Sequence, residues 1–581
     1  MKKNFCCLLF LTVVILWISC SKTGFLDQTA TTSLNEETTF SDSANAMSFL
    51  NNIYTNIGFA SDPRRFSGGN YAAGLDASCD EAEGPNASST NGFIEFATGT
   101  VNPTIVPDDA WSIPYANIRA VNQFLKHLSE IPFSSSLKLE AEGEARFLRA
   151  WYYFMLLEHY GGVPLIGDSI YSVSDQVPQV RNSFESCVNY IANECDSAAQ
   201  NLPVTQTGSN YGRASKGACL ALKARLYLYA ASPLFSNGGV GSGQGNGLDT
   251  IVAYPNADPQ RWQRAANVAE NVILLNAYSL YVDSTSRAGE LGYGFQELFT
   301  QRYNQEYILP RMMDANKYLE SLWDVPSRGG SGGPFPYQEI VDAFPMSNGK
   351  DITDPTSGYD PQNPYKNRDP RLGYSIIHDS TLRILFGANQ PSPVLLYWNT
   401  SVTPAVAASG DAVYKGTPTG YYIFKMLDPA IVNNGISGSS RCLPVIRYAE
   451  ILLDYAEAQN EFAGPDPTVY QAVEAIRQRA GLRPYTLPGG LTQDQMRQAI
   501  INERRIELAY EGHRFFDVRR WKIADSTQNQ EMHGMEVDRG NTVTYKVFNV
   551  RKHNFKESMY LWPLPLSEIA KLPELQQNPL Y

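Results

Sequence analysis

Carboxyl groups gather in one short segment at spacings that could support hydrolysis. Asp80, Glu81 and Glu83 follow closely after Asp76. Two carboxyl groups can act as the acid and the nucleophile or base of glycoside hydrolysis, and oxygen-rich clusters also bind calcium. A solvated loop has the same composition, and sequence order does not give the separation of the groups in space. The segment 76–83 is therefore a candidate acid pair, a candidate structural calcium site or a plain solvated loop.

One serine lies in a pattern known from esterases. The segment GGSGG at 329–333 matches GxSxG, but that motif requires a strand before the serine and a helix after it. Pro326 and Pro334 flank the segment and predict a loop instead. The sequence contains no HExxH, P-loop or GxGxxG pattern, and its six histidines are scattered. We expect a protein that is not an enzyme and that binds no metal or organic cofactor, a structural calcium aside.

Aromatic side chains offer a different chemistry, which is binding without catalysis. They make up 12% of the residues, and 34 of them are tyrosines. The C–H face of a sugar ring stacks on an exposed aromatic ring, while the sugar hydroxyls hydrogen-bond to Asp, Asn, Arg and Gln. The aromatic candidates lie in loop composition and are expected to be exposed: Trp323 first, then Tyr71, Phe93, Phe96, Tyr303, Phe335 and Tyr337. The polar candidates near them are Asp76, Asp80, Glu81, Asn91, Arg302 and Arg328.

The N-terminus indicates export and a lipid anchor. Two lysines precede an apolar run at 8–18, which is too short to span a bilayer and is typical of a signal peptide. Ser19 and Cys20 then resemble the end of a bacterial lipoprotein signal. We expect residues 1–19 to be removed and Cys20 to carry the acyl chains. A secretory peptide with an incidental thiol at Cys20 is the alternative.

Charge and cysteine content exclude several classes of partner and site. Without the signal peptide the chain keeps 45 Lys and Arg against 59 Asp and Glu, a net charge of −14. This acidic balance argues against nucleic acid or an anionic lipid surface as the main partner. The five cysteines besides Cys20 in this part of the chain are scattered and odd in number, so neither a disulfide framework nor a thiolate metal site is expected.

The elements that must position the candidate residues are mostly helical. Apolar residues recur at helical spacing, glycines at 161–162 end the longest helix, and Thr492 with Gln495 forms a capping box. Helices are expected at about 44–57, 111–128, 137–159, 184–200, 214–231, 260–275, 445–463, 467–480 and 492–511. The predicted class is mainly α: tetratricopeptide-like helical hairpin repeats support a large, irregular, loop-rich ligand-binding region with a few short strands.

Composition divides the mature chain into scaffold and loops within a single domain, residues 20–581. The scaffold is expected at about 36–60, 111–232, 259–276 and 445–521. The loop-rich binding region is expected at about 60–110 and 280–440, with short β-type runs at 394–398 and 421–427. A further Gly-rich segment at 236–258 is expected to be a floppy loop.

Four separated stretches resemble, in the family's order, motifs of the SusD/RagB family of outer-membrane lipoproteins. They are EARFLRAWYY at 144–153 running to YGGVPL at 160–165, KGACLALKARLYLYAASP at 216–233, NERRIELAYEGHRFFDVRRW at 502–521, and the C-terminal stretch 560–581 that contains LWPLP. The segment FLD at 25–27 agrees as well. Within the third stretch, Glu503, Glu507 and Glu511 recur every fourth residue among arginines, which predicts an ion-paired scaffold helix rather than a catalytic site.

The resemblance implies a helical scaffold with a loop-built ligand face, held by its lipid on the extracellular side of the outer membrane. It implies a non-catalytic glycan-binding protein that delivers oligo- or polysaccharide to a SusC-like TonB-dependent transporter. Capture of a peptide or glycopeptide, as in RagB-like proteins, is one alternative. A surface glycoside hydrolase using the 76–83 carboxyl groups is the other.

Overall fold

The computed structural model describes residues 35–581, apart from 67–73, 86–91, 108, 173, 284–286, 288, 386, 389, 433–434 and 436. The expected signal peptide and the expected lipid site, Cys20, lie outside the described residues. Within the part of the chain that the structure describes, none of the helices combines the length and the apolar character needed to cross a membrane.

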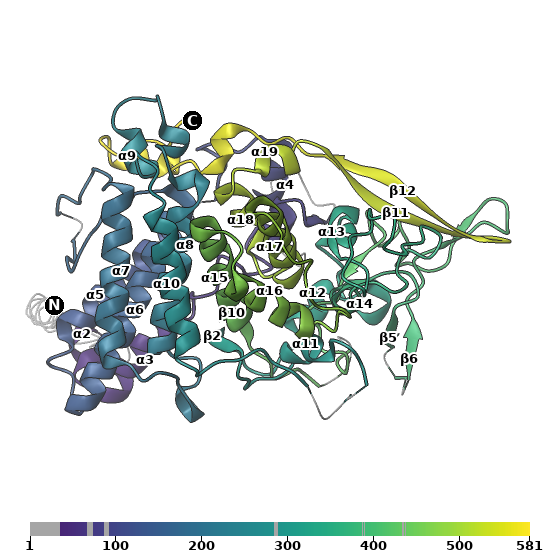
Figure 1. Ribbon diagram of the computed structural model, residues 1–581. Helices are drawn as coiled ribbons and strands as arrows, with labels where there is room; N and C mark the ends of the chain where they lie inside the picture. Colours follow the sequence, from purple (N-terminus) through teal and green to yellow (C-terminus); the bar gives the residue numbers. More distant parts are fainter. Residues whose placement is uncertain are drawn as a thin grey trace, which may run out of the picture.

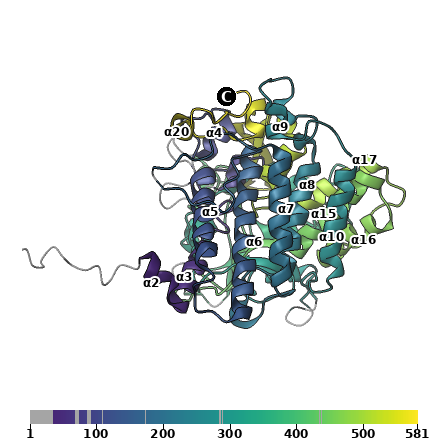
Figure 2. The ribbon, with the colours of Figure 1, turned by 90° about the vertical axis from the view of Figure 1, so that its left-hand side faces the viewer.

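A stack of helices forms one side of the molecule (Figures 1 and 2). Its first members are α5 (Asp109–His127), α6 (Ser135–Tyr160), α7 (Phe184–Asn201), α8 (Lys216–Ala231) and α10 (Gln260–Leu274). Each packs on the next in chain order, and α10 packs on α15 (Tyr448–Ala463), which in turn contacts α16 (Pro467–Arg479) and α17 (Gln493–Glu507). The structure confirms the predicted mainly α fold of helical hairpins.

Local sequence signals set the ends of these helices. Ser134, Ser183 and Ser215 each accept a hydrogen bond from a backbone N–H in the first turn of α6, α7 and α8. Helix α6 ends at Tyr160 because Gly161 takes a φ of 79°, which a residue with a side chain rarely adopts. The expected capping box at the start of α17 is present.

The carboxylates of α17 make ion pairs with distant elements. Glu503 and Glu507 both accept hydrogen bonds from Arg371 of α14 (Pro370–Ser375). Glu507 also pairs with Arg447, directly before α15. Helix α17 ends at Glu507, so the predicted end at residue 511 is wrong and Glu511 lies in the following turn. The expected ion-paired scaffold helix is confirmed, with partners brought from other parts of the chain.

The strands are short, with one exception. Strands β11 (Glu531–Arg539) and β12 (Val543–Lys552) pair as an antiparallel hairpin that projects away from the helical stack (Figure 1). The predicted elements do not include it, although Gly540 and Asn541 precede a run at 543–552 that is rich in β-branched residues, a pattern typical of a strand after a turn. The other strands are β1 (Ala82–Glu83), β2 (Tyr307–Arg311), β3 (Phe335–Pro336), β4 (Ile376–Ile377), β5 (Leu382–Ile384), β6 (Pro391–Pro393), β7 (Trp398–Asn399), β8 (Val406–Ala407), β9 (Tyr422–Ile423) and β10 (Leu443–Arg447).

The loop-rich region is not a loose insertion, because it has a hydrophobic core of its own. Phe295, Leu322, Ile340 and Tyr422 are among the side chains buried there. The Gly-rich segment 236–258 is also more ordered than expected: it contains α9 (Leu248–Val252), and Val252 packs into the main core. The remaining helices are α2 (Glu36–Phe40), α3 (Ser43–Tyr54), α4 (Gly92–Thr98), α11 (Tyr293–Leu298), α12 (Tyr318–Trp323), α13 (Gln338–Ala343), α18 (Arg514–Arg520), α19 (Ala524–Thr527) and α20 (Leu566–Lys571).

Candidate ligand-binding groove

Two adjoining cavities form an open groove between the scaffold and the loop-rich region. Their volumes are about 700 Å³ and about 440 Å³, and both are lined by Tyr211, Gly212, Arg213 and Pro310. The walls come from the end of α3, the segment before α8, and β2 with the segments on either side of it. We call this feature the tyrosine groove, because the tyrosines along it are Tyr54, Tyr211, Tyr278, Tyr303, Tyr307 and Tyr318.

Short-range hydrogen bonds fix the loops that carry these tyrosines. The side chain of Asn304 accepts from the backbone N–H groups of Glu306 and Tyr307, at 2.9 and 2.8 Å, and so shapes the turn into β2. Asn316 accepts from the backbone N–H of Tyr318 at 2.9 Å and shapes the turn into α12. Asn side chains favour such turns because they bond to the backbone two residues on.

Two tyrosine rings meet where the cavities join. The centroids of Tyr211 and Tyr303 are 4.8 Å apart and the rings are inclined at 64°, an edge-to-face contact. Tyr303 is 59% exposed, so one face of its ring is open to solvent. This arrangement presents an aromatic platform that a neighbouring ring already holds in place.

The arginines of the groove are already paired. Arg213 forms hydrogen bonds to Glu144 at 2.9 Å and to Asn51 at 2.6 Å. Arg311 pairs with Asp62 at 2.6 Å, and the hydroxyl of Tyr318 donates to that same carboxylate. The groove therefore offers polar groups without a surplus of positive charge.

The hydroxyls of Tyr54 and Tyr211 stay protonated across the physiological pH range. Burial raises the pKa of Tyr211 to about 12. Burial, followed by the charge of Glu144, raises the pKa of Tyr54 well above its usual value, and the Tyr54 hydroxyl donates to that glutamate at 2.6 Å. These two phenols are consequently neutral at neutral pH.

The structure separates the aromatic residues chosen from sequence. Tyr303 is exposed and lines the groove, whereas Tyr71 lies outside the described residues. The expectation of exposure is wrong for Trp323, Phe93, Phe96, Phe335 and Tyr337, each of which is at most 5% exposed. Phe96 packs against Trp562 and Phe515, and Phe335 against Tyr422, so these rings close hydrophobic cores. A loop-like composition hid helix α4 and the second core that need them.

The polar residues chosen from sequence are also mostly internal. Asp76, Asp80, Glu81 and Arg328 are buried, and Asn91 lies outside the described residues. Arg328 donates to Ser327 and to Ser392. Arg302 is half-buried and donates to the backbone carbonyls of Met313 and Ser440, which supports the loop of Tyr303 rather than reaching into the groove.

The carboxyl cluster at 76–83 is ion-paired and enclosed. Asp80 accepts two hydrogen bonds from Arg514, at 2.9 and 2.6 Å, and one from Arg505. Burial raises the pKa of Asp76 to about 6 and that of Glu81 well above its usual value. Among the described residues, no group of three or more His, Cys, Asp and Glu side chains is placed to hold a metal ion.

The remaining catalytic pattern lies in a loop, as predicted. The GGSGG segment follows α12 and a short 3-10 turn (Pro326–Arg328) and precedes β3, so no strand leads into Ser331 and no helix follows it directly. Gly330 could not carry a side chain, because a Cβ there would lie 1.9 Å from the carbonyl oxygen of Asp324.

Several groove residues did not stand out in the sequence. Tyr54 continues the apolar stripe of α3, so its sequence position predicts a core residue. Tyr211 and Arg213 lie in a short connection between two scaffold helices. Tyr318 begins α12 within a segment that carries no motif. The run Tyr-Gly-Arg at 211–213 is the sequence feature that could have indicated these residues, because it follows a loop of small polar residues at 205–210.

Two family models match the chain. The model described as the SusD family matches residues 295–581, and the model described as starch-binding associating with outer membrane matches residues 24–228. A SusD-like protein of Formosa agariphila is 23% identical over 500 residues, which cover 83% of this chain and 82% of that protein. Another SusD-like protein of the same species is 34% identical over 152 residues, which cover 25% of this chain and 27% of that protein.

Solved structures share the fold over almost the whole length. A SusD-like protein from Bacteroides fragilis has a TM-score of 0.75 and 27% identity, and the match covers 94% of this chain and 98% of that one. A SusD-like carbohydrate-binding protein from the same species has a TM-score of 0.71 and 24% identity, with 93% and 100% covered. With its motifs, its helical stack and both family models in agreement, the chain belongs to the SusD family.

Proposed function

We propose that this protein captures oligo- or polysaccharide at the cell surface in the tyrosine groove and does not cleave it. The observation that carries the proposal is the pair Tyr211 and Tyr303, which present an exposed ring in an open groove whose arginines are already neutralised. Such a surface suits a neutral ligand with an apolar face and many hydroxyls, which is a sugar chain.

The relatives support a glycan as the ligand. One matching family model is described as starch-binding, and a laminarin-binding SusD-like protein has the same fold with a TM-score of 0.58. The non-catalytic part of the proposal is supported by the carboxyl groups at 76–83, because they are buried and Asp80 is held by two arginines.

Location and partner complete the proposal. The lipoprotein-like N-terminus with Cys20 supports an anchor in the outer membrane, and one family model is described as associating with that membrane. A SusC-like TonB-dependent transporter is the proposed recipient of the glycan. The acyl chains on Cys20 would hold the protein beside it, since single chains bind membranes only marginally and several bind stably.

Electrophoresis through gels containing soluble starch, laminarin, xylan, mannan or pectin tests this function. We expect at least one polysaccharide to retard the protein while no new reducing ends form. Tyr303→Ala should relieve that retardation, whereas Tyr485→Ala, which removes another exposed tyrosine outside the groove, should not. Release of sugar products would identify a glycoside hydrolase instead. Binding of peptides with no retardation by any polysaccharide would identify a peptide-capturing protein.

A further inference from the structure

The two cavities of the tyrosine groove differ in the side chains that line them. Tyr303 lines the smaller cavity, of about 440 Å³, and Met312 and Asp314 line the larger one, of about 700 Å³. Tyr303 does not line the larger cavity, and neither Met312 nor Asp314 lines the smaller one. Each volume lies within the range of about 300–1,000 Å³ that is usual for a small-molecule site. The groove therefore has room for part of a ligand on either side of the junction between the cavities.

Gly212 lines both cavities, and its position does not admit a larger residue. Its φ is 89°, and a Cβ there would lie 2.4 Å from Cγ and 2.5 Å from Sδ of Met312. The Met312 side chain thus occupies the space that a side chain at position 212 would take, and its sulfur lies 3.5 Å from that of Cys442. Met312 is nevertheless 37% exposed. It therefore presents an apolar surface, held by its neighbours, to the larger cavity.

The segment around Asp314 is held through its backbone. Arg302 donates to the carbonyl oxygen of Met313 at 2.6 Å, and the side-chain amide of Asn316 donates to the carbonyl oxygen of Asp314 at 2.6 Å. Asn316 also exchanges two backbone hydrogen bonds with Ser439, at 2.9 and 2.8 Å. The Asp314 side chain is exposed, and its carboxylate has no hydrogen-bond or ion-pair partner among the described residues. A carboxylate on a fixed segment is thus available to accept hydrogen bonds from a ligand.

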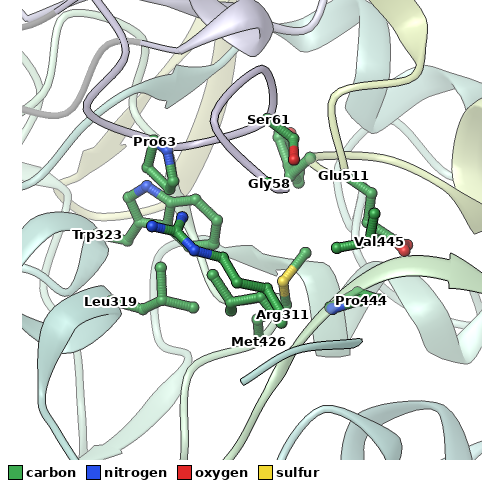
Figure 3. Close-up of a pocket in the computed structure, with 12 residues that line it drawn as sticks. Gly58, Ser61, Pro63, Arg311, Leu319, Trp323, Met426, Pro444, Val445 and Glu511 are labelled. Atoms are coloured by element: carbon green, nitrogen blue, oxygen red, sulfur yellow. The ribbon is translucent and has the colours of Figure 1, made fainter. Parts of the chain in front are cut away.

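A second pocket that Arg311 lines is too small for a sugar ring. Arg311 lines the larger cavity and also this separate pocket, whose volume of about 20 Å³ is room for one water-sized group. Figure 3 shows the Arg311 side chain extending toward Trp323 in this view, with Leu319 and Met426 beside it. The Arg311 side chain also packs closely on Gly58, because a Cβ there would lie 2.9 Å from Cδ of Arg311. A bound chain can therefore extend along the groove but cannot enter this pocket.

We infer that the tyrosine groove contains two sugar subsites, one at Tyr303 and one at Met312 and Asp314, and that a single glycan chain passing Gly212 fills both. The inference rests on the proposed function and deepens it, because it makes the protein selective for chain length. At the second subsite, Met312 contacts the C–H face of a sugar ring and Asp314 accepts hydrogen bonds from its hydroxyl groups. The two contacts reinforce each other, because the second forms at a high effective concentration once the first has formed.

Calorimetry with a length series of oligosaccharides tests the inference. The series runs from the disaccharide to the octasaccharide and is prepared from starch, laminarin, xylan, mannan or pectin, whichever retards the protein in gels. In the wild type we expect the affinity to rise by about tenfold or more from the trisaccharide to the hexasaccharide. The affinity should then level off, because both subsites are filled.

Variants of each subsite separate the two contributions. Met312→Ala and Asp314→Asn should each weaken the hexasaccharide by about two- to tenfold and the trisaccharide by less than about twofold, because the trisaccharide binds at the aromatic platform. Tyr303→Ala should weaken both sugars. Leu382→Ala is the control for Met312→Ala, because it shortens a side chain that is 61% exposed and lies outside the groove, and it should change neither affinity.

Three outcomes would count against the inference. If Met312→Ala and Asp314→Asn weaken both sugars equally, or weaken neither, there is no separate second subsite, while glycan binding at Tyr303 stands. A wild type that binds the trisaccharide and the hexasaccharide with the same affinity would also overturn it. If none of the oligosaccharides or polysaccharides binds the wild type, the proposed function fails and the inference with it.

Discussion

Replacing Glu507 with Gln should destabilise the protein by about 3–5 kcal/mol, because it removes one charge from a balanced buried network. Five cations and five carboxylates are joined by ion pairs: Arg371, Lys425, Arg447, Arg477, Arg479, Glu306, Asp369, Glu503, Glu507 and Glu511. The Glu507 side chain is 0% exposed and pairs with Arg371, Arg447 and Arg479. Glutamine keeps the shape but leaves one buried positive charge uncompensated.

The loss should depend on pH in a defined direction. Burial alone would raise the pKa of Glu507, but Arg479, Arg447 and Arg371 outweigh it and hold the pKa far below the ordinary value of 4.5. A carboxyl group with a lowered pKa contributes stability that is present above its unfolded pKa and is lost as the pH falls. The difference between wild type and Glu507→Gln should therefore be full at pH 7 and shrink below about pH 4.5.

Urea denaturation followed by tryptophan fluorescence, at pH 7 and at pH 4, measures this difference. Glu290→Gln is the matched control, because Glu290 pairs with Arg287 at the surface, where both side chains are about half exposed. We expect the control to change the free energy of unfolding by less than about 0.5 kcal/mol. Equal shifts in the two variants, or a Glu507→Gln deficit that does not shrink at low pH, would refute the reasoning.

Four other predictions address the groove, the buried acid, the loop serine and the anchor. Tyr303→Ala should weaken the bound glycan by about two- to tenfold in calorimetry, from the loss of one stacking platform, and an unchanged affinity would remove Tyr303 from the site. Asp76→Asn should raise the free energy of unfolding at pH 7.5 by about 1–3 kcal/mol and should give no gain near pH 4. The reason is that the pKa of Asp76 is raised to about 6, so the wild type loses stability as the pH rises from 3.8 to 6. Ser331→Ala should leave glycan retardation in gels unchanged, and a loss would contradict its placement outside the tyrosine groove. Cys20→Ser should move the protein from the membrane to the soluble fraction of cells, and persistent membrane association would argue against the lipid anchor.

The scaffold could be predicted from sequence because its signals are local. Apolar spacing, serine caps and the glycine at 161 each act within one or two helical turns, so the ends of α6, α7 and α8 fall within a few residues of their predicted positions. The partners of Glu503 and Glu507 could not be predicted, since Arg371 lies more than 130 residues away in the chain. Ion-pair partners at such separation depend on tertiary packing.

The groove was harder to predict because burial in the loop-rich region depends on long-range packing, which places Phe96 in the main core and Trp323 in a second core. Trp323 and Phe96 look like exposed platforms in loop composition, yet both are at most 2% exposed. Tyr303 looks the same in sequence and is 59% exposed. Tyr211 and Tyr303 are far apart in the chain and meet at 4.8 Å only when β2 pairs with β10 and brings the loop before it against the end of the scaffold.

The most direct test of a glycan-capturing groove is the crystal structure of the protein with the oligosaccharide that it binds best. We predict an intact sugar chain in the tyrosine groove, with one ring on the open face of Tyr303. A sugar bound outside the groove, or a chain cleaved beside the 76–83 carboxyl groups, would contradict the account.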